Sequence, residues 1–280
     1  MTVILPPAPS GAAPVSQELL LALLADARLP TGAHTQSAGL EPALRAGLRP
    51  DEVPAYIAAR LRTVVRVEAA TAVVARHVAL GAVRAPGHAG TSDAGMSDGV
   101  AVTAGLAAVG RAWAARTPSG AMRQSAEHLG RGYLRLVRRL WADHPAVAAL
   151  DAVEPGPGPA DPPPLGEPGR GTPRGRARRG PPRAVVLGVT AVCAGLDPLG
   201  VARLVAYDDV QTVASACLKL APVDPVVTTG WVLAAAPAVD ALAHELAHLT
   251  DAGGIPASGA PLTEQWAETH ARATERLFSA

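Results

Sequence analysis

Apolar residues recur every three to four positions along most of the chain, a spacing that places them on one face of an α-helix. The four clearest stripes are Met122/Ala126/Leu129/Tyr133/Leu136/Leu140, Ala206/Val210/Val213/Cys217/Leu220, Val239/Leu242/Leu246/Leu249 and Trp266/His270/Ala273/Leu277. No segment alternates apolar and polar residues over the length of a strand. The valine-rich stretch from Ala184 to Leu196 fits a buried strand or a buried helix, and we interpret it as a helix. The pattern predicts an all-α fold, a single compact multi-helix domain resembling a helical bundle.

Helix start signals accompany three of these stripes. Thr117-Pro118 and Asp197-Pro198 each place a capping side chain directly before a proline, whose fixed φ suits the first helical position. Near the C-terminus, we expect Thr263 to cap a helix with Glu264 in its first turn.

Three stretches interrupt the helical pattern. Residues 1–15 are rich in Pro and Ala, residues 84–98 are rich in Gly, Ser, Asp and Pro, and residues 151–183 combine many Pro and Gly with six arginines near the end. Such segments bury too little apolar surface to offset the entropy lost on ordering. We expect a disordered N-terminus, a mobile loop, and one helical domain over 16–280 that carries a disordered insertion at about 151–183.

Charge and hydropathy give no reason to expect nucleic acid or a membrane as a partner. The net charge is +1, and the basic run Arg170–Arg183 lacks interleaved aromatic residues, so we interpret it as a solvated linker. The N-terminus has no basic segment and no long apolar core, which excludes a signal peptide. The charge-free run from Pro225 to Val239 is shorter than a bilayer requires. We expect a soluble, cytoplasmic protein with Cys193 and Cys217 reduced.

The side-chain inventory adds two observations. Apolar residues make up 49% of the chain but aromatic residues only 3%, so the core must consist of Ala, Val and Leu, which allow helices to approach closely. Lys219 is the single lysine and Phe278 the single phenylalanine. The bias toward Ala, Gly, Pro and Arg is typical of GC-rich coding, and the survival of these two residues hints that their positions need an ammonium and a phenyl ring.

The segment 244–248, His-Glu-Leu-Ala-His, matches the HExxH pattern of zinc peptidases, in which two histidines bind zinc and the glutamate is the general base. Both histidines lie away from the apolar stripe of their helix and should face solvent. The longer form of the motif fails because Asp251 and Gly254 stand where Gly and His are required, although Glu264 or Glu268 could act as a distal third ligand. We interpret the segment as a polar helix face and keep a zinc peptidase as the alternative function.

The remaining chemistry indicates neither a catalytic site nor a cofactor. The segment around Lys219 lacks the glycines of a phosphate-binding loop, and the histidines are too scattered to store a metal. Helical projection groups Asp208, Thr212 and Ser215 with Lys219, opposite the apolar stripe. This polar strip fits a partner-binding surface or an ordinary solvated face, and the residues alone leave both open.

Five segments, in order, make the chain similar to the UreF family of urease accessory proteins. They are Leu19-Leu20 through Leu29-Pro30-Thr31-Gly32, Ser37-Ala38-Gly39-Leu40-Glu41, the arginine-bearing stretch Met122–Trp141, Lys219-Leu220-Ala221-Pro222-Val223, and the tail from His270 to Arg276-Leu277-Phe278. Departures from the family pattern occur at His34, Gln36, Pro225, Ala271 and Thr274.

The resemblance implies an all-α homodimer that performs no bond-making chemistry and has no cofactor. It implies binding to the accessory protein UreD (also called UreH), recruitment of the nickel GTPase UreG, and docking of the assembly on apo-urease. In this interpretation the tail residues His270, Arg276, Leu277 and Phe278 anchor UreD. The strip Asp208, Thr212, Ser215 and Lys219 is a candidate UreG surface. The residues Pro30, Gly32, Ser37, Gly39, Leu40 and Glu41 have a structural role. A helical interaction module outside urease maturation is a further alternative.

Overall fold

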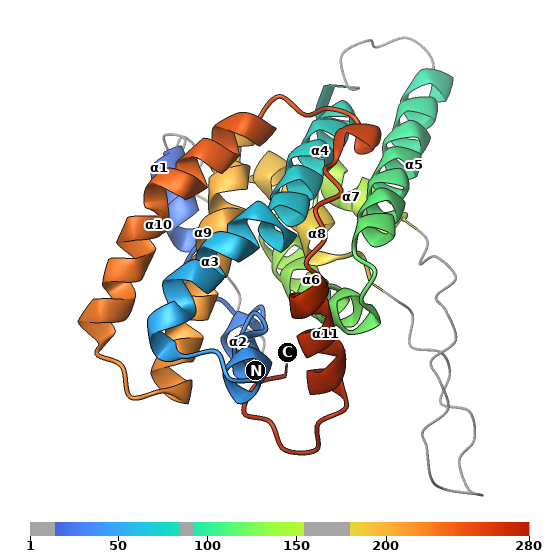
Figure 1. Ribbon diagram of the computed structural model, residues 1–280. Coiled ribbons are helices and arrows are strands. Elements are labelled where there is room, and N and C mark those ends of the chain that lie inside the picture. The colour runs from blue at the N-terminus through green and yellow to red at the C-terminus, as the bar shows by residue number, and fades with distance from the viewer. Residues whose placement is uncertain (1–14, 85–91, 154–179, 280) are drawn as a thin grey trace, which may run out of the picture.

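The computed structural model describes residues 15–84, 92–153 and 180–279, and every regular element within them is a helix. The expectations for residues 1–14, 85–91 and 154–179 lie outside the described residues. The α-helices are α1 (Gln17–Leu24), α2 (Leu40–Arg45), α3 (Val53–Arg62), α4 (Val64–Arg84), α5 (Ser92–Arg116), α6 (Gly120–Leu140), α7 (Pro145–Asp151), α8 (Arg183–Cys193), α9 (Pro198–Leu220), α10 (Pro225–Leu246) and α11 (Pro261–Ala271). The all-α prediction is confirmed (Figure 1).

Helix α4 lies at the centre of the molecule and contacts α3, α5, α7, α8, α9 and α10 (Figure 1). Its buried apolar side chains are all Val or Ala. Helix α8 packs against it so closely that a Cβ atom on Gly188 would lie 2.5 Å from the main-chain oxygen of Ala72. The expected core of small side chains and closely spaced helices is therefore present.

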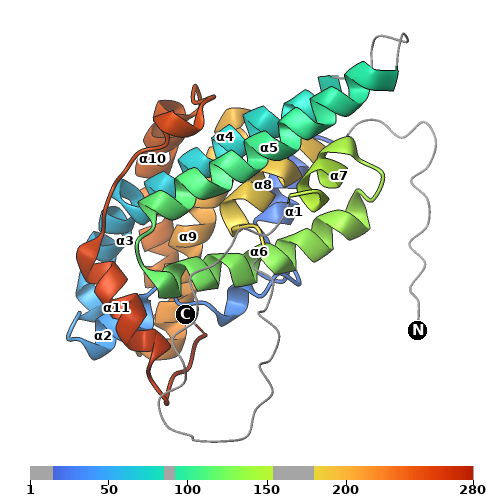
Figure 2. The same cartoon turned by 90° about the vertical axis from the view of Figure 1, so that its right-hand side faces the viewer.

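Helix α6 lies across α8 on one face of the molecule (Figure 2). A Cβ on Gly130 would lie 2.1 Å from the Pro181 oxygen, and one on Gly132 would lie 2.2 Å from the Thr31 oxygen. Glycine is required at both positions because two loops cross α6 at main-chain contact distance. One of these loops is the Pro30–Gly32 turn, where Gly32 has a φ of +86°.

The expected helix starts are correct for α9 and wrong for α6. Asp197 caps α9 by accepting a hydrogen bond from the Gly200 N–H at 2.6 Å. The cap of α6 is Ser119, which accepts from the Met122 N–H at 3.2 Å, so the helix begins after Thr117-Pro118. The prediction stopped at the first capping signal and overlooked a serine two residues further on.

Helix α11 also begins at a different residue from the one expected. Pro261 occupies its first turn, which places Thr263 inside the helix instead of at its cap. Glu264 turns back to accept a hydrogen bond from the Ala260 N–H at 3.1 Å. The carboxylate of Glu264 therefore satisfies a main-chain donor that the expected threonine cap would have left free.

The interruptions between helices are shorter than expected. Helix α5 already begins at Ser92, inside the predicted loop 84–98. Helix α7 continues to Asp151, and α8 begins at Arg183, so both edges of the predicted insertion belong to the folded helices. Arg183, assigned to the solvated basic run, is buried because its guanidinium pairs with Asp208. The helical interpretation of the valine-rich stretch is confirmed by α8.

Helix α10 packs on α9 and α3 but leaves much of its surface uncovered. Val226 and Leu233 are 76% and 75% exposed. In the described part of the chain, α10 is the one helix whose length and composition would suit a membrane span. Only 17% of its most apolar window is buried.

Candidate partner-binding surface

The C-terminal tail folds back onto α2 through one buried carboxylate. Glu41, 1% exposed, accepts hydrogen bonds from the Leu277 N–H and the Phe278 N–H, each at 2.8 Å. Arg45, one turn later on α2, pairs with the same carboxylate at 2.7 Å. Burial of this charge is tolerated because three donors converge on it. Main-chain hydrogen bonds at Leu277 and Phe278 therefore fix the tail against α2.

The two residues that are unique in the composition meet at this tail. Phe278 is 4% exposed, and the Lys219 ammonium lies 5.2 Å from the centre of its ring. His270 donates from Nε2 to the Phe278 carbonyl at 3.2 Å, and the Ser279 N–H donates to Thr35 O at 2.8 Å. A cation above a ring at this distance is attracted by the ring's negative face. The end of α9 and the chain terminus consequently form one surface.

The predicted tail anchor divides into an inner and an outer pair of residues. His270 and Phe278 are buried in their own chain. Arg276 is exposed and Leu277 is 62% exposed. The role of these four residues in binding a partner stays a prediction, and only the outer pair faces solvent.

The predicted polar strip on α9 runs from the interior to the surface. Asp208 pairs with Arg183, and Thr212 lines a cavity. Ser215 accepts a hydrogen bond from Gln211 at 3.2 Å. Lys219, at the end of the helix, is exposed. The strip is therefore less uniformly exposed than the helical projection indicated.

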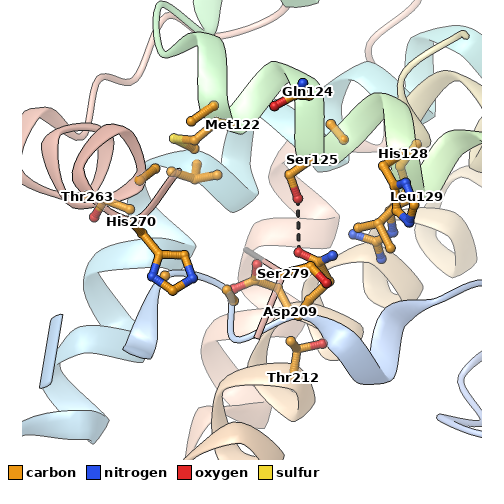
Figure 3. Close-up of a pocket in the computed structure, with 18 of the residues that line it drawn as sticks. Met122, Gln124, Ser125, His128, Leu129, Asp209, Thr212, Thr263, His270 and Ser279 are labelled. Carbon is orange, nitrogen blue, oxygen red and sulfur yellow. Dashed lines mark hydrogen bonds between the residues drawn. The ribbon is translucent and has the colours of Figure 1, made fainter. Parts of the chain in front are cut away.

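A cavity of about 400 Å³ lies between α6, α9, α11 and the tail (Figure 3). Ser125 points into it from α6 and donates to Gln36 at 2.9 Å. Asp209 and Thr212 line it from α9, and His270 approaches from the other side. The cavity is bordered by Asp208 and Thr212 of the α9 strip and by His270 and Arg276 of the tail, so the two predicted partner sites meet at one cavity.

Three charged residues that the sequence analysis did not single out, Arg60, Glu68 and Asp209, line the cavity. Arg60 forms a two-pronged pair with Asp209, at 2.8 Å (Nε–Oδ1) and 2.6 Å (Nη2–Oδ2). Burial opposes the charge on Arg60, but the Asp209 carboxylate outweighs it and raises the pKa of Arg60. Glu68 accepts from the Trp113 indole N–H at 2.5 Å, and burial raises the pKa of its carboxyl group. The pair of adjacent acids Asp208 and Asp209, in an otherwise apolar helix, was the sequence signal that could have indicated these charges.

The family-like turn lies directly beside the cavity. Ser37 is fully buried and Gly39, with a φ of +76°, precedes α2. A Cβ on Gly39 would lie 2.9 Å from the hydroxyl of Tyr56, which donates to the Ala38 oxygen at 2.8 Å. Leu40 and Glu41 then begin α2, fully and almost fully buried. The structural role that the resemblance implied for these positions stays a prediction.

The departures from the family pattern occupy varied places. Gln36 accepts the Ser125 hydrogen bond, and Lys219 donates to the main-chain oxygen of His34 at 3.5 Å. Pro225 takes the first turn of α10 after the cap Asp224, where a missing N–H costs nothing. The tail departures at positions 271 and 274 are exposed.

The HExxH segment does not form a three-ligand metal site. His244, Glu245 and His248 are exposed, and Glu245 pairs with Arg66 of α4. Glu268, one proposed third ligand, instead accepts from Ser119 at 2.6 Å and from the Ala121 N–H at 2.9 Å. Within the described residues, no three His, Cys, Asp or Glu side chains lie close enough together to hold a metal ion.

Comparison with known proteins agrees with this picture. The UreF family model matches residues 49–236. The urease accessory protein UreF of Mycobacterium sp. (strain JLS) is 30% identical over 265 residues, covering 92% of this chain and 97% of that protein. The UreF of Mycolicibacterium vanbaalenii is 29% identical over the same shares of both chains. The chain belongs to the UreF family of urease accessory proteins.

Proposed function

We propose that this chain is a non-catalytic, cytoplasmic scaffold that binds UreD (UreH) and recruits the nickel GTPase UreG to apo-urease. In this role it helps nickel insertion and modulates GTP hydrolysis. Membership of the UreF family supports a role in urease maturation. The observation that carries the finer proposal is the contact of Lys219 with Phe278, since it makes one surface of the two segments expected to bind partners.

UreD is proposed to bind the outer side of the tail. A protein that approaches the tail meets Arg276 and Leu277 first, because Phe278 is already packed inside the chain. Arginine is enriched among the residues that dominate interfaces, and the exposed Leu277 beside Arg276 adds apolar area that a partner can cover. The buried Glu41 carboxylate would hold this anchor in place before binding and so reduce the entropy lost on association.

UreG is proposed to bind beside Lys219. This residue is the exposed end of the α9 strip, and it touches the tail on one side and the His34 loop on the other. A change at the tail would therefore alter the position of the ammonium. That connection offers a physical route by which UreD binding could promote recruitment of the GTPase.

A second copy of the chain is proposed to cover the outer face of α10. The exposed apolar side chains there are Val226, Val227 and Leu233, with Leu218 at the end of α9. A row of exposed large apolar residues on one helix marks an interaction surface in a protein that functions in water. The face is therefore the candidate homodimer interface.

The absence of catalytic chemistry is supported by the state of the HExxH segment. Its glutamate is held by Arg66 and so is not free to act as a general base. A peptidase also requires a third protein ligand for zinc, and the structured part of the chain offers none in reach.

The experiment that tests the proposal is co-purification of the chain with its cognate UreD and UreG. The wild type is compared with Arg276→Ala/Leu277→Ala, and Thr274→Ala is the matched control on the exposed tail. We expect a ternary complex with the wild type and the control, and loss of UreD from the double variant. No complex from a folded wild type would contradict the scaffold function.

Deletion of residues 276–280 is a less specific test. It would remove Phe278 from the core and leave the buried Glu41 carboxylate without two of its donors. The deletion should therefore lower the unfolding temperature as well as weaken binding. The point variants avoid this because their side chains face solvent.

A further inference from the structure

The cavity between α6, α9, α11 and the tail is large enough for a small organic molecule (Figure 3). Its volume of about 400 Å³ lies in the range of pockets that bind such molecules, about 300–1,000 Å³. Gln124, His128 and Arg131 of α6 line the cavity and are also exposed to solvent. A ligand can therefore enter beside α6 without the unfolding of a helix.

The acidic side chains at the cavity are already occupied. Asp209 accepts two hydrogen bonds from Arg60, at 2.8 and 2.6 Å. Asp208 accepts one from Arg183 at 2.5 Å. Burial raises the pKa of the third lining carboxyl group, Glu68, and so favours its neutral form. The described part of the lining therefore offers a ligand few acceptors and little negative charge.

An amide donor, in contrast, is left without a partner. Ser125 donates to Oε1 of Gln36 at 2.9 Å, and the described residues supply no acceptor for Gln36 Nε2. Gln36 is 8% exposed and lines the cavity. Among the described side chains, only Thr31 Oγ1 is fully enclosed and without a partner, so Gln36 Nε2 must reach the open space of the cavity. A ligand oxygen there would complete its hydrogen bonding.

Two guanidinium groups add positive charge to the same cavity. Arg131 lines it from α6, and its Nη2 lies 3.3 Å from Nδ1 of His128. Arg276 borders it from the tail and donates to the Ser279 oxygen at 3.3 Å. Over the ranges that the structure describes, neither arginine is paired with an Asp or Glu. A guanidinium in this state is suited to bind a carboxylate through two parallel hydrogen bonds.

The amide and the Arg131 guanidinium belong to one stretch of the cavity wall. Ser125, His128 and Arg131 follow one another at three-residue spacing on α6, so their side chains share one helix face. Gln36 is bonded to the first of the three, and His128 contacts the last. Figure 3 shows Ser125 and His128 on this wall.

We propose that the cavity binds a small organic carboxylate, which Gln36 Nε2 and the Arg131 guanidinium hold by hydrogen bonds. The excess of donors favours a ligand that carries acceptor oxygens, and the unpaired guanidinium groups favour a negative charge. A bound cation would instead face these two arginines. The inference rests on the cavity alone and is independent of the UreD and UreG contacts.

The test is isothermal titration calorimetry of the full chain with succinate, at constant ionic strength and in a buffer without other carboxylates or phosphate. Succinamide, which is neutral and of the same size, is the control ligand. The wild type is compared with Arg131→Gln and Gln36→Met. Arg135→Gln is the matched control, because Arg135 is an exposed arginine of α6 that does not line the cavity.

We expect the wild type and Arg135→Gln to bind one succinate per chain, and we expect no binding of succinamide. Each site variant should bind succinate about tenfold more weakly or less, because it loses a hydrogen bond to a charged group. Absence of saturable succinate binding by the wild type would overturn the proposal, and so would equal binding of succinamide or unchanged affinity in both site variants. None of these results would affect the scaffold function, because UreD and UreG are absent from the experiment.

Discussion

Helices α8 and α10 are both apolar, but α8 is almost completely buried whereas α10 is largely exposed. Nearly every residue of α8 is buried, including Arg183 at its first position. Helix α10 is twice as long and exposes Val226 and Leu233 to solvent. Gly188 of α8 touches the backbone of α4, whereas a Cβ on Gly230 of α10 would meet nothing within 4 Å.

The difference separates two uses of apolar sequence. In α8 the small and branched side chains let neighbouring helices such as α4 and α6 approach closely, and their burial stabilises the fold. In α10 similar residues remain uncovered, which a monomer in water does not tolerate without a reason. Apolar composition alone therefore predicts that a helix will be covered, but it does not tell which neighbouring surface covers it. That information depends on how the helices pack.

The largest expected effect concerns the ion pairs of the two helices. Asp208→Asn removes the partner of Arg183, whose side chain is 10% exposed, and should destabilise the fold by about 3–5 kcal/mol. Asp240→Asn, on α10, removes the partner of Arg203 on α9. Both side chains are roughly half exposed, so the loss of stability should be about 1 kcal/mol or less. Urea unfolding monitored by circular dichroism measures both. Equal losses would contradict the assigned burial of α8.

A smaller effect is expected from matched glycine replacements. Gly188→Ala should destabilise by about 1–3 kcal/mol, because the new methyl group would overlap the Ala72 carbonyl. Gly230→Ala should stabilise by about 0.5–1 kcal/mol, because alanine loses less entropy than glycine in a helix and the site is open. The same unfolding experiment checks both signs. A destabilising Gly230→Ala would show that the face is already covered.

Leu233→Glu should change the state of association more than the stability. The side chain is 75% exposed, so its replacement costs the single chain little. If a second copy covers α10, the substitution places a charge in that interface and shifts dimer to monomer in light scattering. Leu262→Glu, at an exposed leucine of α11, is the matched control and should leave the mass unchanged. Loss of dimer in the control alone would place the interface elsewhere.

The smallest effect concerns pH and the carboxyl group of Glu68 on α4. Burial raises the pKa of Glu68, so the folded state holds this proton more tightly than the unfolded state. The stability contributed by neutral Glu68 is present at low pH and is lost as pH rises through the raised pKa. Glu68→Gln cannot ionise and can still accept from Trp113. Its stability relative to wild type should therefore increase with pH above the ordinary carboxyl range, whereas a constant difference would contradict the assignment.

Helical periodicity was sufficient to predict the all-α fold, because each apolar stripe depends on neighbours in sequence. The stripe on α9 and its Asp197 cap, for example, are local features. The stripe nearest the C-terminus was predicted too long, since α11 ends at Ala271 and leaves Ala273 and Leu277 outside the helix. Local reasoning failed at segment ends, where competing signals lie within two or three residues. Arg183 was assigned to a linker because its partner Asp208 lies 25 positions away and no local pattern predicts the pair.

The site was predictable only where composition or family resemblance marked a residue. Lys219 and Phe278 were marked as unique residues, and the structure brings them together. Nothing in the spacing showed that Glu41 would receive the tail from 237 positions away, or that Arg60 would pair with Asp209. Such contacts depend on how distant helices pack, which a single sequence does not display.

The most direct test of the scaffold account is the nickel content of urease assembled with and without this chain. Urease subunits and the other accessory proteins are produced in a host that lacks any UreF, and nickel per active site is measured on the purified enzyme. The account predicts intact subunits with little nickel and little activity, both restored when this chain is supplied. Urease that is fully loaded without the chain, at limiting nickel, would contradict the central claim.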